Sequence, residues 1–137
     1  MKKKNKVSVI INCLNGEKFL KQAINSVLKQ DHQNLEIIFW DNHSTDNSIK
    51  QLKEIKTYRK IKLYESSKTI KLYNARNSAI KKATGKYIAF LDVDDTWERE
   101  KISSQVQRIE KENSDLIYSN HWILSRGNKT LFRKTKL

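Results

Sequence analysis

The sequence has a single cysteine, three glycines and no apolar run long enough to cross a membrane. Because Cys13 has no second thiol to pair with, no internal disulfide can form, and nothing indicates an oxidising compartment. Cys13 lies in an apolar run, where we expect a buried small residue rather than a nucleophile. We therefore expect a cytoplasmic domain.

The small number and the positions of the glycines exclude two classes of nucleotide-binding protein. Gly16, Gly85 and Gly127 form neither the phosphate loop that ends in Gly-Lys-Ser/Thr nor the dinucleotide fingerprint. Any bound phosphate must instead be neutralised by a metal ion and basic side chains. A phosphate-receiving response regulator would need acidic residues after its first strand, where this chain has Asn12.

Positive charge dominates what is present. The 28 Lys and Arg residues outnumber 15 Asp and Glu, which gives a net charge of +13 and indicates an acidic partner: nucleic acid, a phosphorylated ligand or an anionic membrane surface. The segment Lys50–Lys86 is especially basic, and we interpret it first as a solvated face, with docking on an anionic inner membrane surface left open. A basic nucleic-acid-binding module is the alternative function, but no such signature is present, and we expect no nucleic-acid partner.

Strand and helix patterns alternate along the chain, which predicts one α/β domain over residues 1–137. We expect helices after the first, second, third and fourth strands, with Gly85 closing the third helix, and a hairpin around Gly127-Asn128. The predicted strands are Val7–Ile11, Leu35–Trp40, Ile61–Tyr64, Tyr87–Leu91 and Asp115–Ser119.

Polar residues follow three of these strands, at 12–17, 41–46 and 92–95. In a doubly wound sheet, ligands bind outside the carboxyl ends of the strands, where the strand order reverses. We therefore expect the three segments to line one crevice.

The acids Asp92, Asp94 and Asp95 follow an apolar strand that reads as buried on both faces. On an extended strand Asp92 and Asp94 would point to the same side, with Asp95 at the turn. Oxygen ligands alone suit Mg²⁺ or Mn²⁺ completed by phosphate oxygens, so a nucleoside diphosphate is the expected companion. Alternatively, these acids only cap the next helix, with Asp95 or Thr96 as N-cap.

Several stretches together resemble the successive motifs of family 2 glycosyltransferases with the GT-A fold. The resemblance covers nearly all of residues 7–120, in order and with ordinary spacing. The stretches are Val7–Gly16, Ser26–Gln30, Asp41–Asp46, Ala75–Asn77 and Gly85–Asp95.

The resemblance implies a Rossmann-like, mostly parallel sheet with helices on both faces and a donor site for a nucleoside diphosphate sugar. It implies metal-dependent, inverting transfer to an acceptor hydroxyl of a cell-surface glycan or a lipid-linked acceptor, in polysaccharide biosynthesis. By this resemblance, the base would be held by Asn12, Leu14, Asn15 and either Asp41 or Asn42. Arg76 would reach the base or a phosphate, and Asp92 and Val93 would face the nucleotide. The metal would be bound by Asp92, Asp94 and Asp95.

The chain departs from the family pattern in three ways. Asn12 and Leu14 stand where the family usually has Pro and Tyr. The resemblance implies a UDP-sugar donor, but Asn42 stands where many members have a second acid, and because an amide can both donate and accept, thymidine and guanosine donors stay open. Family members usually extend further, so we expect the catalytic base and acceptor pocket beyond Leu137, and find no candidate base between Asp115 and Leu137. The chain therefore reads as a donor-binding part that is slow or inactive alone.

Overall fold

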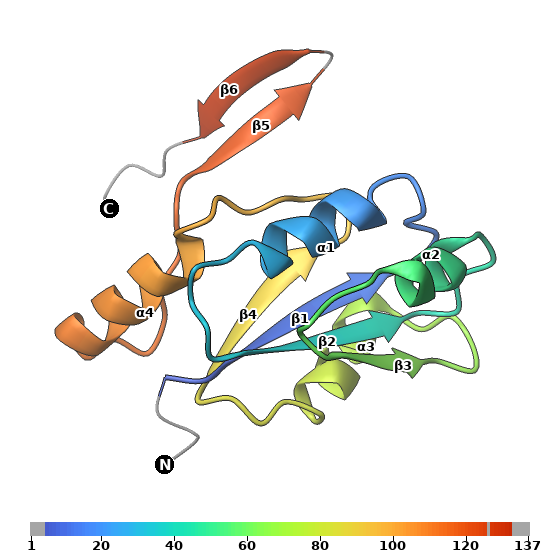
Figure 1. Ribbon diagram of the computed structural model, residues 1–137, viewed down its shortest axis with the longest axis horizontal. Helices are drawn as coiled ribbons and strands as arrows, with labels where there is room; N and C mark the ends of the chain where they lie inside the picture. The colour runs from blue at the N-terminus through green and yellow to red at the C-terminus, as the bar shows by residue number, and fades with distance from the viewer. Residues whose placement is uncertain (1–4, 126, 133–137) are drawn as a thin grey trace. The chain divides into compact units, whose positions relative to one another are not determined.

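The computed structural model describes residues 5–125 and 127–132 (Figure 1). Two compact units are distinguished, residues 1–103 and 104–137, and each is described by itself. The predicted single domain over 1–137 stays a prediction. In the described part of the chain, no helix combines the length and the apolar character that crossing a bilayer requires.

The first unit is built on a four-stranded parallel sheet with the order β3-β2-β1-β4. The strands are β1 (Val7–Cys13), β2 (Leu35–Asp41), β3 (Ile61–Glu65) and β4 (Tyr87–Asp92). Runs of Val, Ile and Phe favour extended backbone, and every residue of the central strand β1 is buried. The predicted parallel α/β sheet is confirmed.

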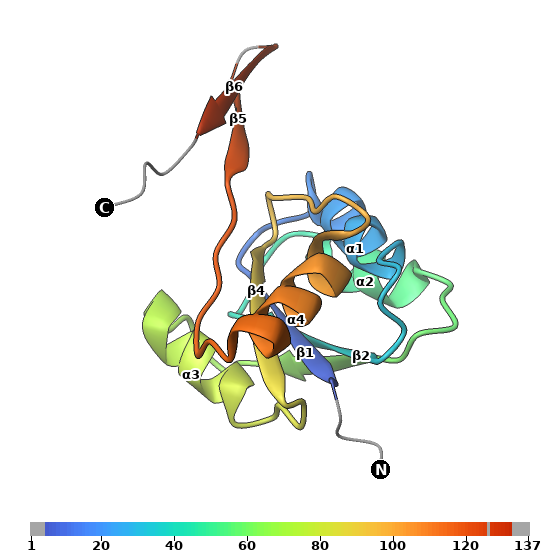
Figure 2. The same cartoon turned by 90° about the vertical axis from the view of Figure 1, so that its left-hand side faces the viewer.

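Helices lie on both faces of the sheet, as predicted (Figure 2). The helices α1 (Leu20–Leu28) and α2 (Ser48–Glu54) cover one face, and α3 (Leu72–Ile80) covers the other. Small side chains let α3 approach the strands closely, because Ala79 packs directly on Ile10 and Ile38. Since successive strand residues point to opposite faces, the side chains of Val9 and Ile11 point to the face that α1 covers.

The strand β4 is less covered than expected. Its pattern reads as buried on both faces, but Ile88 and Phe90 are 42% and 45% exposed. The strand forms one edge of the sheet, and α3 packs on β1 and β2 rather than over it. The apolar run was therefore correct evidence for a strand and wrong evidence for its burial.

Two helix boundaries also differ from expectation. The helical apolar pattern in the sequence starts at Glu17, but the first helix begins at Leu20. A turn precedes it, in which Gly16 O accepts hydrogen bonds from Phe19 N at 3.0 Å and Leu20 N at 2.9 Å. The third helix ends at Ile80, so Gly85 is not its cap. Gly85 instead touches β1: a Cβ there would lie 2.7 Å from Ser8 N.

After β4 the chain forms the expected fourth helix, α4 (Lys101–Glu112), whose apolar residues Ile102, Val106 and Ile109 recur at helical spacing and are buried. The predicted strand Asp115–Ser119 is wrong, since this segment is irregular and its apolar residues are largely exposed. The predicted hairpin is confirmed as β5 (His121–Ser125) and β6 (Asn128–Phe132), which pair antiparallel. Gly127, with φ of +82°, takes the left-handed turn conformation that glycine favours.

Candidate functional site at the carboxyl edge of the sheet

The three predicted polar segments, residues 12–17, 41–46 and 92–95, meet at one edge of the sheet. The central strand β1 has β2 on one side and β4 on the other, so the strand order reverses beside it. In register, Asn12 lies beside Asp92 and beside Trp40, and Cys13 lies beside Asp41. The carboxyl ends of β1, β2 and β4 therefore bring together residues that are far apart in sequence, at the point where such sheets bind ligands.

The loops after β1 and β2 are tied together by reciprocal hydrogen bonds. Asn15 N donates to Ser44 Oγ at 2.9 Å, and Asn15 Oδ1 accepts from Thr45 N at 2.8 Å. Asn15 has a φ of 54°, a left-handed conformation that asparagine tolerates. Its amide oxygen is thus used to fix the neighbouring loop.

The same two loops also share their acidic residues. Glu17 N donates to Asp46 Oδ2 at 3.0 Å, while Asn47 N donates to Glu17 Oε2 at 2.8 Å. Asp46 also accepts from Ser48 N at 2.9 Å. Burial acts to raise the pKa of Asp46, but these hydrogen bonds outweigh it and hold that pKa below its ordinary value. Glu17 and Asp46 therefore hold the loops together, a role that sequence reasoning missed.

The neighbouring residues Asp41 and Asn42 differ in how far their hydrogen-bonding capacity is used within the protein. Asp41 is 3% exposed, and its Oδ2 accepts from Ser44 N at 3.0 Å. Its Oδ1 is buried and has no hydrogen-bond partner within residues 5–125 and 127–132. The Asn42 amide is paired with Ile70, to which it donates at 2.7 Å and from which it accepts at 3.1 Å. Asp41 therefore keeps one unsatisfied acceptor, whereas the Asn42 amide fixes the loop before α3.

Asn12 and Leu14, the two departures from the family pattern near the end of β1, occupy different environments. Leu14 is exposed and reaches outward, while Asn12 is 8% exposed. In the part of the chain that the structure describes, three buried polar atoms on the α3 side of this edge have no hydrogen-bond partner: Asn12 Oδ1, Trp40 Nε1 and Arg76 Nε. Because an unpartnered buried polar atom costs about 1–3 kcal/mol, such a group indicates a place for water or ligand atoms.

An arginine from α3 faces the acid at the end of β4. Arg76 Nη2 lies 2.6 Å from Asp92 Oδ1, and both side chains are partly exposed. The Arg76 guanidinium also lies over the Phe90 ring, with Cζ at 5.8 Å from the ring centroid. A cation and a carboxylate are thus held side by side at the strand reversal, where a phosphorylated ligand with its metal would meet both charges.

The predicted metal-binding acids lie on a turn. Asp95 N donates to Asp92 O at 3.0 Å, so the chain reverses after Asp92 and the expected extended arrangement of Asp92 and Asp94 is wrong. The side chains of Asp92, Asp94 and Asp95 are all exposed. The alternative role as helix caps is also wrong, since α4 begins only at Lys101.

Close packing with the loop after β1 fixes the position of this turn. A Cβ on Gly16 would lie 2.8 Å from both methyl carbons of Val93 and 2.9 Å from Cys13 Sγ. Only a glycine leaves this space to Val93. The turn that carries the acids is therefore seated against the loop that follows β1, and sequence reasoning had no signal for this contact.

The acids are compatible with a hard divalent cation but do not enclose one by themselves. Over residues 5–125 and 127–132, no group of at least three His, Cys, Asp or Glu side chains is gathered as a metal cage. Magnesium-type sites commonly use one or two carboxylates and take their remaining ligands from water and phosphate. Exposed carboxylates on one turn, with no nitrogen or sulfur ligand among them, fit that pattern.

The chain's single thiol, Cys13, is buried at this edge. Burial raises the pKa of Cys13, and the nearby Asp41 carboxylate raises it further, against hydrogen bonds from Ser48, Ser44 and Gly16 N. A buried, protonated thiol is a poor nucleophile, as expected for Cys13.

Comparison with known proteins places this arrangement in a family. The chain is 36% identical over 122 residues to the Escherichia coli UDP-Glc:alpha-D-GlcNAc-diphosphoundecaprenol beta-1,3-glucosyltransferase WfgD, covering 89% of this chain and 48% of that protein. This chain thus spans about half the length of that relative.

Solved structures with the same fold include S. aureus TarS 1-349 in complex with UDP-GlcNAc, with a TM-score of 0.74 and 28% identity over 80% of this chain and 32% of that one. The mannosyltransferase PcManGT from Pyrobaculum calidifontis, solved with GDP-Man and Mn²⁺, shares the fold with a TM-score of 0.71 and 24% identity, over 76% of this chain and 32% of that one. Residues 8–136 match the family described as Glycosyl transferase family 2. With its sheet order and these neighbours, the chain has the GT-A fold and belongs to glycosyltransferase family 2.

Proposed function

We propose that the carboxyl edge of the sheet binds a nucleoside diphosphate sugar, with uridine as the preferred nucleoside. The observation that carries the proposal is the convergence of Asp41, Arg76 and Asp92 from three different elements. The uridine preference is supported by the names of WfgD and of the TarS complex, which specify UDP-Glc and UDP-GlcNAc.

The nucleoside end of the donor lies against β1 and β2. The buried Asp41 Oδ1 has no partner and is suited to accept a hydrogen bond from the ring N–H of uracil. Leu14 offers an exposed apolar surface for the base in place of an aromatic wall, and Asn12 and Asn15 border it. Asn42 acts indirectly here, because its pairing with Ile70 shapes the neighbouring loop.

The diphosphate end of the donor lies against Arg76 and the turn after β4. Arg76 exchanges part of its interaction with Asp92 for a phosphate or base oxygen, since a guanidinium can serve both. Val93 shapes the turn, Asp92 faces the ribose, and Asp92, Asp94 and Asp95 are the proposed ligands of Mn²⁺ or Mg²⁺. When bound, the metal neutralises negative charge on the departing diphosphate.

The whole enzyme is proposed to transfer the sugar to a hydroxyl of a lipid-linked glycan, in polysaccharide biosynthesis. The proposal is supported by WfgD, whose named acceptor is a diphosphoundecaprenol-linked sugar. Inverting transfer stays part of the proposal, and we assign no residue of the described ranges as catalytic base. The 137-residue chain is expected to bind donor and metal, and to transfer sugar slowly or not at all by itself.

Calorimetric titration with UDP and Mn²⁺ tests the donor site. We expect Asp94→Ala to lower UDP affinity by at least about tenfold, because charge-assisted interactions contribute about 1.5–3 kcal/mol each. Glu54→Ala is the matched control, since Glu54 is also an exposed acid but is the last residue of α2, away from the proposed site. Chelation with EDTA should weaken UDP binding by the unmodified chain to the level of Asp94→Ala. Equal UDP binding by all three proteins would refute the metal-assisted site.

A further inference from the structure

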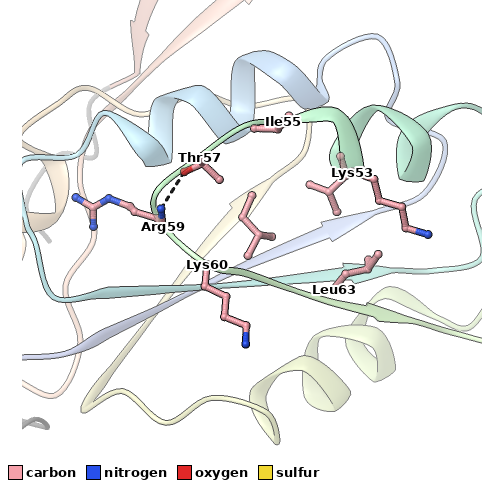
Figure 3. Close-up of a pocket in the computed structure, with 8 residues that line it drawn as sticks. Lys53, Ile55, Thr57, Arg59, Lys60 and Leu63 are labelled. Atoms are coloured by element: carbon pink, nitrogen blue, oxygen red, sulfur yellow. Dashed lines mark hydrogen bonds between the residues drawn. The ribbon is translucent and has the colours of Figure 1, made fainter.

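A pocket separate from the carboxyl edge lies where α2 is followed by β3 (Figure 3). Its volume is about 260 Å³, and its apolar lining comes from Leu52, Ile55, Ile61 and Leu63. Lys53 and Lys60 line it from opposite sides. Since β3 begins at Ile61, this pocket sits toward the amino end of the strand, away from the proposed donor site.

The segment 55–60 that borders the pocket is held in place by Arg59. Although charged, Arg59 is only 8% exposed, and its guanidinium donates to Gln33 O and Gln30 O at 3.2 Å each. Arg59 Nε also donates to the hydroxyl of Tyr58 at 3.2 Å. Tyr58 is nevertheless 81% exposed, so the fold presents an aromatic side chain outward from an anchored backbone.

Positive charge surrounds this aromatic residue. Lys53, Lys56 and Lys60 are all exposed, and residues 53–64 contain one acid, Glu54. Lys62 differs from them because it is paired with Glu36 at 2.8 Å. The segment therefore combines three solvent-facing lysines, one exposed tyrosine and an aliphatic pocket on a single connection, here called the α2–β3 surface.

We propose that the α2–β3 surface docks on an anionic lipid bilayer. The lysines would lie among phosphate headgroups, Tyr58 at the boundary between headgroups and acyl chains, and the aliphatic pocket against lipid methylenes. Tyrosine suits this boundary because it has an apolar ring and a polar tip. Single-stranded nucleic acid is less well matched, because base binding uses several stacked aromatic platforms and the lining of this pocket is aliphatic.

This inference rests on the proposed function, in which the acceptor is lipid-linked. The five residues of β3 connect the α2–β3 surface to the carboxyl edge. At about 3.3 Å per residue, that distance is roughly 17 Å. Docking would therefore hold the donor site near the bilayer and leave its opening uncovered.

Vesicle co-sedimentation tests the α2–β3 surface. The 137-residue chain is compared on neutral vesicles and on vesicles with about 30 mol% anionic phospholipid at low salt. Because each lysine near such a surface contributes about fivefold, the variant Lys53→Ser/Lys56→Ser/Lys60→Ser should bind anionic vesicles roughly 100-fold more weakly. The control Lys18→Ser/Lys21→Ser/Lys29→Ser removes the same charge around α1 and should lose no more than about threefold.

A second variant reports directly on insertion. The unmodified chain already has three tryptophans, so its emission is subtracted from that of Tyr58→Trp; the difference should shift to shorter wavelength with anionic vesicles and stay unchanged with neutral ones. An equal loss of vesicle binding in both triple variants, or no shift for Tyr58→Trp, would overturn the proposal. Binding of single-stranded RNA that disappears only in the α2–β3 triple variant, without vesicle binding, would overturn it in favour of a nucleic-acid surface.

The titration with UDP and Mn²⁺ separates this inference from the proposed function. The α2–β3 triple variant should keep the UDP affinity of the unmodified chain, because its lysines lie away from the carboxyl edge. Normal UDP binding without vesicle binding would refute the docking surface alone. Vesicle binding without UDP binding would refute the donor site and leave the docking surface supported.

Discussion

The two ends of the parallel sheet use carboxylates in opposite ways. At the amino end, Glu36 is 6% exposed and is surrounded by partners: Lys62 and Lys6 pair with it at 2.8 and 3.1 Å, and Ser8 and Thr84 donate to it. At the carboxyl end, Asp94 is exposed, and the buried Asp41 Oδ1 has no hydrogen-bond partner among the residues that the structure describes. A carboxylate saturated by its own protein supports the fold, whereas carboxylates with acceptor capacity left over are available to a ligand.

The environment of Glu36 explains why a buried acid is tolerated there. Burial acts to raise the pKa of Glu36, but hydrogen bonds from Lys62, Ser8, Thr84 N and Lys6 outweigh it and hold that pKa far below its ordinary value. Glu36 also joins β1, β3 and the segment before β4 to β2, because its partners come from each of them. It therefore holds together the amino end of the sheet, opposite the proposed donor site.

The largest expected effect comes from breaking the amino end. Glu36→Ala should lower the free energy of unfolding by about 3 kcal/mol, because it leaves several donors without their acceptor. Urea denaturation measures this change, and Glu54→Ala, an exposed acid on α2, is the matched control that should change stability by less than about 0.5 kcal/mol. The folded fraction of Glu36→Ala should bind UDP with unchanged affinity.

The pH dependence of this effect has a fixed sign. The folded-state pKa of Glu36 is lowered, so its stabilising contribution is fully present at neutral pH and is lost as the pH falls below the ordinary glutamate value. The stability difference between the unmodified chain and Glu36→Ala should therefore shrink in acid. A difference that stays constant from neutral to acidic pH would mean that the charge of Glu36 is unimportant.

A smaller effect is expected from disturbing the turn at the carboxyl end. Gly16→Ala places a methyl group against Val93 and Cys13, and overpacking of this kind costs about 1–3 kcal/mol of stability. UDP affinity with Mn²⁺ should fall as well, because the turn that carries the acids must move. Adding Val93→Ala should restore part of both quantities; a double variant as impaired as Gly16→Ala would show that the contact with Val93 does not position the turn.

The smallest expected effect has opposite signs for two ligands. Arg76→Met releases Asp92 from its 2.6 Å ion pair, so Mn²⁺ alone should bind about threefold more tightly, a value typical of exposed charge pairs. UDP in the presence of Mn²⁺ should bind more weakly, because the phosphate or base loses its cation. Paramagnetic resonance of free Mn²⁺ and calorimetry measure the two affinities. Arg76→Lys keeps the charge, and if it matched Arg76→Met in both assays, positive charge at this position would be irrelevant.

Much of this contrast could be predicted from the sequence. The apolar runs before Asp41 and Asp92 predicted parallel strands, and parallel strands bring their carboxyl ends to one edge, so the meeting of Asn12, Asp41 and Asp92 followed from topology alone. Arg76 was found through its place in a family motif. The predicted GT-A fold is confirmed by the sheet order and by the structural neighbours.

The details that depend on contacts between distant segments could not be predicted. Whether Asn42 is free or paired depends on where Ile70 lies, and periodicity holds no information on that contact. The exposure of Phe90 depends on β4 being at the edge of the four-stranded sheet. The turn at Val93 replaced the expected extended segment because Asp95 N bonds back to Asp92 O.

The interlocked loops after β1 and β2 have a consequence for engineering donor preference. Asn15 and Glu17 on one loop are bonded to Thr45, Asp46 and Asn47 on the other, so neither loop keeps its shape when its counterpart is exchanged. Grafting residues 14–19 alone from a relative that uses another nucleotide would mismatch the hydrogen-bond donors and acceptors between the two loops. A chimera designed to change the nucleotide preference must therefore exchange residues 14–19 and residues 42–48 together.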